Sequence, residues 1–242
     1  MDIASLDFIF LVICALLTST LAGIIGQGGG LILFAVLALY LKLPLLIAFH
    51  SVIQLSSNAS RAFLATPHIK WNIITPILFG TFLGATIITP MIDTANWHWI
   101  EPIIAIYILT QLWLKLPVNF SKLPKPLFIT GLFQGALGML FGATGPLGNT
   151  LLYKLGFNKN EIVASNAVIM SASHLIKILL FMLMGVTLSS ETIPLIILSI
   201  VAIFGSKMGT AVRGFVSETL FILLFKGCLT VLAIRMLITP FV

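Results

Sequence analysis

Charged side chains are scarce in this chain of 242 residues. Asp, Glu, Lys and Arg make up 8% of it, whereas an ordinary soluble domain has about 25%. Hydrophobic residues make up 59%, and no stretch is left for a separate soluble domain. Because a transmembrane helix needs about 20 largely apolar residues, this composition predicts an all-α polytopic membrane protein.

The chain also lacks the motifs of common catalytic and nucleotide sites. It contains no Ser/His/Asp set, no HExxH, no paired catalytic carboxylates and no Walker A loop. Cys14 and Cys228 have no CxxC or Cys/His spacing, and we interpret both as packing residues. The basic residues behind the net charge of +6 form no cluster on a soluble face, which argues against nucleic-acid binding. We therefore expect that the protein is not an enzyme and that it binds no metal and no cofactor.

Ten apolar segments follow one another along the chain. We expect the first five at 6–25, 31–41, 45–64, 73–92 and 99–116, and the second five at 127–141, 147–155, 162–184, 193–212 and 219–239. The first is expected to be an uncleaved span. The second segment of each set is about half a bilayer long, so it is either a re-entrant half-helix or one end of a longer span. A linker rich in proline and lysine at 117–126 separates a first membrane repeat, 1–116, from a second, 127–242.

Equivalent connections of the two repeats carry opposite charge. Residues 61–70 are basic and 185–191 hold only an acidic Glu191, while 93–101 are acidic and 207–218 are net basic. Positive loops face the cytoplasm, so the repeats should be inverted, with 61–70, the linker and 154–159 inside; only Lys42 disagrees. Five crossings per repeat produce this inversion. Eight spans in a parallel repeat, with the short segments re-entrant, are the alternative.

Residues 26–61 and 142–177 repeat one element at an offset of 116. Gly26 aligns with Gly142, Gly29 with Gly145 and Ser57 with Ser173. Each copy starts with a glycine break and continues into a helix with a polar stripe. Duplicated membrane units tend to place a substrate site between their copies.

The first break holds Gly26, Gly28, Gly29 and Gly30, and the second runs through Thr144, Gly145 and Asn149. Glycine costs about 1 kcal/mol against alanine inside a helix. Broken backbone at membrane depth must be buried in protein or line a wet cavity. We expect each break to present the first N–H groups of the following short helix to an anion. Tight helix packing is the alternative interpretation.

The polar stripe lies on the helix that follows each break. His50, Gln54, Ser57, Asn58 and Arg61 share one face of the first copy, and Asn166, Met170, Ser173, His174 and Lys177 share the equivalent face of the second. We interpret the stripes as walls of an oxyanion pathway, with His50 and His174 as candidates for proton transfer. Hydrogen bonding between helices is the alternative. Arg61 is interpreted as an interfacial anchor, and Lys177 as a deeper cation that attracts the anion.

Small-xxx-small patterns occur in the fourth segment of each repeat. Gly80 and Gly84 form one pattern, and Gly205 and Gly209 form the other. Such patterns let two helix backbones approach closely. We predict that these four glycines pack helices.

Four stretches together resemble the TauE/SafE family of sulfite and organosulfonate exporters. They are GIIGQGGGLIL at 23–33, LPLLIAFHSV at 43–52, FGATGPL at 141–147 and EIVASNAV at 161–168. The resemblance extends over about residues 8–238. It implies a prokaryotic-type, multi-pass permease of the plasma membrane that moves small sulfur-containing anions. The family's glycine positions correspond to Gly26, Gly28, Gly29, Gly30, Gly142 and Gly145.

We therefore expect a secondary transporter for a small anion, sulfite or an organosulfonate, that works by alternating access. The N–H groups near 28–30 and 144–145 would hold the anion, and Ser57, Asn58, Asn166 and Ser173 would orient it. Membrane lipid is the other expected partner, and the oligomeric state stays open. A membrane-embedded accessory subunit and an anion channel are the alternatives.

Overall fold

Helices form nearly all of the described part of the chain in the computed structural model. The described residues are 5–26, 28–41, 45–93, 124–141, 144–188 and 192–213, with single residues and pairs within 102–114 and 226–238. The elements are α1 (Ser5–Ile25), α2 (Gly29–Leu37), α3 (Leu45–Leu64), the 3-10 turn η1 (Thr66–His68), α4 (Trp71–Asp93), α6 (Pro126–Phe141), α7 (Gly145–Lys154), α8 (Lys159–Leu183) and α9 (Thr192–Val212).

These helices coincide with eight of the ten expected segments. Four of them, α1, α4, α8 and α9, are long and apolar enough to cross a membrane. The helices α2 and α7 have 9 and 10 residues, so each covers about half of a bilayer. The two fifth segments, 99–116 and 219–239, lie largely outside the described residues. So do most of the linker, the acidic turn 93–101, Lys42 and Gly142.

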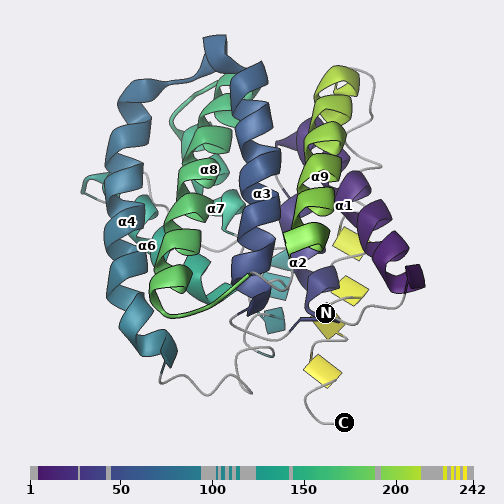
Figure 1. The fold of residues 1–242 in the computed structure, drawn as a ribbon. Helices are drawn as coiled ribbons and strands as arrows, with labels where there is room; N and C mark the ends of the chain where they lie inside the picture. The colour runs from purple at the N-terminus through teal and green to yellow at the C-terminus, as the bar shows by residue number, and fades with distance from the viewer. Residues whose placement is uncertain are drawn as a thin grey trace.

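Helices from the two halves pack on each other across the molecule. In Figure 1, α3 and α8 lie in the middle, with α9 and α1 on one side and α4 and α6 on the other. The closest pairs, α1 with α9 and α4 with α6, each combine one helix from each half. At an offset of 116, α1 corresponds to α6 and α4 to α9. Exchanging the halves therefore turns one pair into the other.

Glycine makes these cross-half contacts close. A Cβ atom added to Gly84 of α4 would lie 2.0 Å from the Leu132 carbonyl oxygen of α6, and one added to Gly209 of α9 would lie 1.9 Å from that of Thr20 in α1. Cβ atoms added to Gly80 and Gly205 would lie 2.2 and 2.5 Å from carbonyl oxygens of the same partner helices. The prediction that these four glycines pack helices is confirmed. Any side chain there would push two backbones apart.

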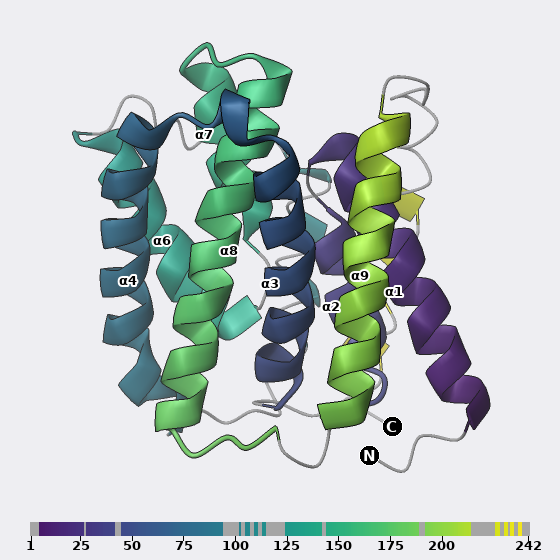
Figure 2. The ribbon, with the colours of Figure 1, turned by 45° about the horizontal axis from the view of Figure 1, so that its top comes forward.

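The directions of the helices agree with an inverted pair. Along the contacts between α4 and α6, residue numbers rise in the same direction in both helices, and the same holds for α1 and α9. Each pair is therefore parallel. The helices α3 and α8 are antiparallel, because Lys70, just after α3, bonds Ser165 early in α8, whereas His50 early in α3 meets His174 further along. Figure 2 shows α3 and α4 antiparallel around η1. Corresponding helices of the halves thus run in opposite directions.

Candidate functional site

A central cavity lies where the two glycine breaks meet α3 and α8. It is lined by Ala22, Gly26, Gly28, Gly30, Leu31, His50, Gln54, Asn58, Arg61, Thr144, Gly145, Asn166, Met170 and His174. Its volume accessible to water is about 40 Å³. One water molecule needs about 10–15 Å³ of such volume. The cavity therefore has room for a few waters or one small ion.

Both short helices begin at the cavity. Gly28 precedes α2 with φ of 91°, and Gly26 has φ of 84°; side chains other than that of glycine rarely adopt this region. Thr144 precedes α7, and neither helix has a side-chain cap on its N–H groups. The first N–H groups of a helix have no partner within the helix. Two positive helix ends therefore face one cavity from opposite halves.

Close packing fixes the first break in place. A Cβ atom at Gly29 would lie 1.9 Å from the Thr18 carbonyl oxygen of α1, and one at Gly26 would lie 2.4 Å from Cγ2 of Val163 in α8. A Cβ atom at Gly30 would lie 2.9 Å from Oε1 of Gln54. The break is thus held between α1, α3 and α8.

The two polar stripes meet at a pair of histidines. The rings of His50 and His174 lie 5.6 Å apart between centroids, with an edge-to-face geometry. Nε2 of His50 lies 2.9 Å from the Gly30 carbonyl oxygen. Nδ1 of each histidine and Oδ1 of Asn166 are buried and have no partner among the described residues. Buried polar groups are nearly always hydrogen-bonded, so these atoms are suited to a bound molecule or water.

Arg61 is part of the cavity wall, and its assignment as an interfacial anchor was wrong. The side chain is only 4% exposed. Its Nη1 donates to the Ala22 carbonyl at the end of α1, and its Nη2 donates to Oδ1 of Asn58. Nε has no partner among the described residues. The break after α1 leaves carbonyl groups that attract a cation, and this holds Arg61 inside the bundle.

Arg213 contacts the same helix end from the other half. Its Nε and Nη2 donate to the Gly23 carbonyl at 2.9 and 2.7 Å. Partial burial lowers the pKa of this guanidinium, which nevertheless stays protonated at neutral pH. Arg213 is absent from the lining of the cavity, so it stabilises the end of α1 without contacting the cavity.

Lys177 occupies the position in the second half that Arg61 occupies in the first. At the offset of 116, Arg61 corresponds to Lys177 and Ala22 to Gly138. Lys177 is 2% exposed, and its Cδ lies 4.0 Å from the position of a Cβ atom on Gly138, near the end of α6. Each half thus brings one buried basic side chain to the helix that precedes its break.

The charge around the cavity is of one sign. Arg61 is the only Lys, Arg, Asp or Glu among the described lining residues. Lys177 and Arg61 both lie within electrostatic range of His174. A buried cation is costly unless a negative partner accompanies it. The arrangement therefore favours a small anion.

Ten of the fifteen predicted site residues line the cavity. They are Gly26, Gly28, Gly30, His50, Gln54, Asn58, Thr144, Gly145, Asn166 and His174. The other five, Gly29, Ser57, Asn149, Ser173 and Lys177, are outside that lining. Ser57 accepts a bond at its carbonyl from Ser206 Oγ at 3.0 Å, so this part of the stripe connects α3 with α9.

Gln134 of α6 is a buried polar residue that sequence reasoning missed. Its side chain is fully buried, and neither amide atom has a partner among the described residues. Its Oε1 and Oδ1 of Asn166 lie 3.1 and 2.9 Å from the position of a Cβ atom on Gly148. The offset of 116 aligns it with Thr18, a second polar residue in an apolar segment. This pairing of polar residues in the two repeats could have identified Gln134 from the sequence.

Comparison with known proteins gives one family. The family model described as "Sulfite exporter TauE/SafE" matches residues 11–236, nearly the whole chain. This match confirms the resemblance inferred from the glycine motifs. Neither a curated protein nor a solved structure matches the chain. Among the described residues, no three His, Cys, Asp or Glu side chains gather as metal ligands.

Proposed function

Because the chain belongs to the TauE/SafE sulfite exporter family, we propose that it carries sulfite, or a closely related small oxyanion, through the central cavity. At the level of the family it is a membrane transporter of sulfur-containing anions. The observation that carries the proposal is the meeting of two uncapped helix starts with Arg61 in a cavity that no described carboxylate lines. Helix N-termini and guanidinium groups are both suited to oxyanions.

The size of the cavity favours sulfite over a bulky organosulfonate. Sulfite has one sulfur and three oxygen atoms, a size comparable to the few waters for which the cavity has room. Gln54, Asn58 and Asn166 lie around the same space and supply amide groups for orientation. A longer organic tail would need the walls to move apart.

Alternating access is the proposed mechanism. The striped helices α3 and α8 come from opposite halves and pack against each other, so a change in their relative tilt would open the cavity towards one side or the other. His50 and His174 meet at the cavity and are proposed to exchange a coupling proton. Asn58, Ser57 and Ser173 would guide the anion along α3 and α8.

The proposed setting is the plasma membrane of a prokaryotic-type cell. The end of the bundle that holds η1, Lys70 and the turn 155–158 is here called the Lys70 end. Basic residues are concentrated in its connections, so the proposed orientation places this end in the cytoplasm.

Transport by purified protein in liposomes tests the proposal. Uptake of labelled sulfite, sulfate and a small sulfonate would be measured with and without a pH gradient. We expect saturable sulfite uptake that unlabelled sulfite on the opposite side accelerates, because a carrier exchanges cargo between its two states. Equal leakage of every anion contradicts the proposal.

The same experiment distinguishes the two other classes of protein. An anion channel would give flux that does not saturate and is not accelerated by exchange. An accessory subunit would give no flux, although the protein is folded and inserted. Either result would replace the transporter assignment for this chain.

A further inference from the structure

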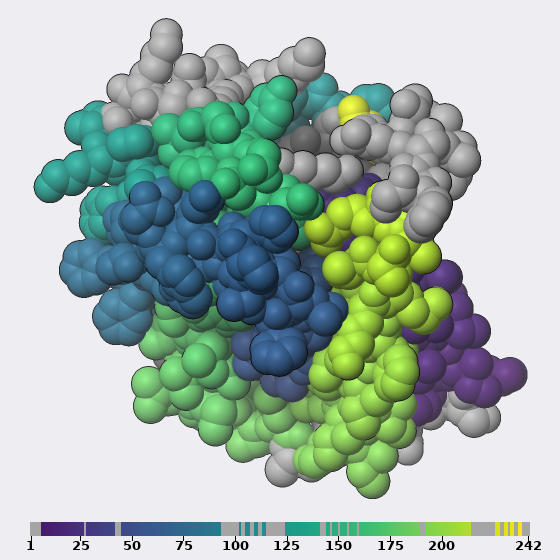
Figure 3. Space-filling model, turned by 90° about the horizontal axis from the view of Figure 1, so that it is seen from above, coloured from purple at the N-terminus to yellow at the C-terminus, as the bar shows by residue number. Residues whose placement is uncertain are grey.

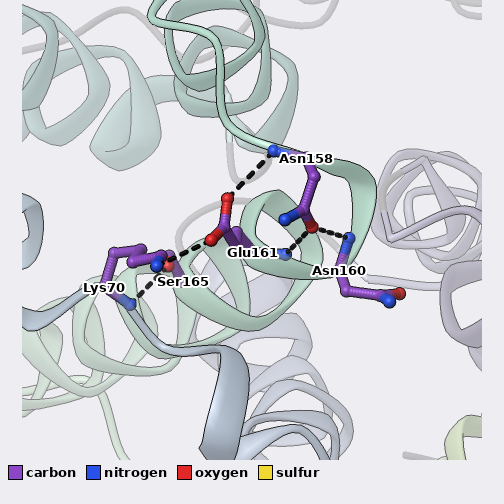
Figure 4. A network of polar contacts seen from close by, with 5 residues as sticks. All are labelled: Lys70, Asn158, Asn160, Glu161 and Ser165. Carbon is purple, nitrogen blue, oxygen red and sulfur yellow. Dashed lines mark hydrogen bonds and ion pairs between the residues drawn. The ribbon is translucent and has the colours of Figure 1, made fainter.

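A polar network ties the two halves together at the Lys70 end. Lys70, which follows η1 in the first half, forms an ion pair with Glu161 of α8 in the second, with 2.6 Å between Nζ and Oε1. The backbone N–H of Lys70 also donates to Ser165 Oγ at 3.0 Å. Figure 4 shows both contacts converging on the first two turns of α8. The connection after α3 is thus bound to the start of α8.

Glu161 serves two partners at once. While Oε1 pairs with Lys70, Oε2 accepts the backbone N–H of Asn158 at 3.0 Å. Oδ1 of Asn158 in turn accepts the N–H groups of Asn160 and Glu161, which completes a capping box at the start of α8. One carboxylate therefore joins a rigid helix start to the opposite half.

The same two turns of α8 pack against the first glycine break, which lines the central cavity. Val163 lies between Glu161 and Ser165 in the sequence, and its Cγ2 occupies the space beside Gly26 that a Cβ atom would need. Val163 is buried, and Asn166, the next residue after Ser165, lines the cavity. In Figure 3, seen from the Lys70 end, the connection after α3 lies beside the start of α8. Moving this part of α8 away would uncover the first break from that end.

The equivalent positions at the other end of the bundle cannot form this network. The offset of 116 maps Lys70 to Val186, Glu161 to Leu45 and Ser165 to Phe49. Val163 maps to Ile47, which is fully buried. A buried apolar residue therefore occupies the equivalent position in both halves, whereas the residues of the polar network occur in one.

We propose that the first two turns of α8 form a gate at the Lys70 end, with Val163 as its plug and the Lys70–Glu161 ion pair as its latch. The latch stabilises the state that is closed at this end, and opening breaks the ion pair while the capping box keeps α8 helical. The inference rests on the proposed alternating access. It gives the two states unequal energies, because the equivalent positions at the opposite end, Leu45 and Val186, cannot form this ion pair.

Thiol labelling of the plug tests the gate without any cargo. In a background with Cys14 and Cys228 replaced by alanine, Val163→Cys would be labelled by a membrane-impermeant thiol reagent in nanodiscs. We expect Lys70→Ala and Glu161→Gln each to raise the labelling rate by up to about five-fold, which is the range for a partly exposed ion pair. Glutamine at position 161 keeps the capping box. The double variant should be no faster than either single one.

Ile47→Cys is the matched control at the opposite end. Its labelling should fall or stay constant when the latch is removed, because the population moves towards the state open at the Lys70 end. An unchanged rate at Val163→Cys, effects that add in the double variant, or equal rises at both cysteines would overturn the gate. Labelling needs no sulfite, so failure of the gate and failure of the sulfite assignment give different results.

Discussion

Arg61 contacts both the end of α1 and the central cavity. Its guanidinium donates to the Ala22 carbonyl and to Asn58, and it leaves Nε without a partner in the described structure. Arg213 donates to the neighbouring Gly23 carbonyl but does not line the cavity. Arg213 therefore supports only the helix end, whereas Arg61 both supports that end and lies where the proposed anion would bind.

Replacing Arg61 with glutamine should weaken sulfite transport more than replacing Arg213. A hydrogen bond to a charged group contributes about 1.5–3 kcal/mol, so we expect Arg61→Gln to raise the KM for sulfite by about 10- to 100-fold. Arg213→Gln should change it by less than about three-fold, a shift below 1 kcal/mol. Initial uptake rates over a range of sulfite concentrations measure both. Equal losses in the two variants contradict a direct role for Arg61.

The histidine pair should determine whether a pH gradient drives transport. His174→Gln keeps a polar side chain but removes titration, so uptake should no longer respond to an imposed gradient between about pH 6 and pH 8, a range that brackets an ordinary histidine. His68→Gln is the control, since His68 lies exposed on η1. Uptake by both is measured in the same liposomes. A full response in His174→Gln excludes that histidine as the proton carrier.

At the scale of elements, the glycine breaks and the polar faces of the helices could be predicted from the sequence. Repetition at a fixed offset located both breaks, and the spacing of polar residues located both stripes. The position of Arg61 could not be read, because it depends on the carbonyls of α1 lying beside the end of α3. Gln134 was missed for a similar reason: one polar residue in an apolar segment shows its neighbours only after α6, α7 and α8 pack.

Alanine at Gly28 should impair transport, whereas alanine at Gly156 should not. Both glycines have positive φ, 91° and 84°, so either substitution stores strain of about 1–3 kcal/mol. Gly28 starts α2 at the cavity, and Gly156 lies in the turn after α7 with no other atom near the position of its Cβ. Thermal unfolding should show similar losses for the two variants, while uptake falls only in Gly28→Ala. Equal uptake by the two variants would show that the first break is not part of the transport site.

The pairing of α4 with α6 should be sensitive to a single methyl group. A Cβ atom at Gly135 would lie 2.0 Å from the Thr81 carbonyl oxygen, whereas one at Gly138 would make ordinary contacts at 3.5 and 4.0 Å. We expect Gly135→Ala to destabilise the protein by about 1–3 kcal/mol. Gly138→Ala, on the same helix, should change the stability by less than about 1 kcal/mol. Unfolding in detergent compares the two, and equal stabilities would show that the backbones can separate.

For the whole molecule, the halves interlock. Because α1 packs on α9 and α4 packs on α6, each outer pair contains one helix from each half, and a rigid movement of residues 1–116 against 127–242 would break both pairs. The inverted directions were predictable from loop charge. The packing of α1 on α9 and of α4 on α6 was not predictable from the sequence, because it depends on which small-residue faces fit together. The division of the chain at 117–126 stays a prediction.

The central claim is that one small oxyanion binds between the two helix starts. Crystals of the protein with Cys14 and Cys228 replaced by alanine, soaked in selenite, would test it by anomalous diffraction, since selenite has the shape and charge of sulfite and selenium scatters anomalously. We predict one selenium peak between Gly28 and Gly30 of the first break and Thr144 and Gly145 of the second, beside Arg61. The peak should disappear in Arg61→Gln. A peak elsewhere, or one unchanged by that substitution, would contradict the account.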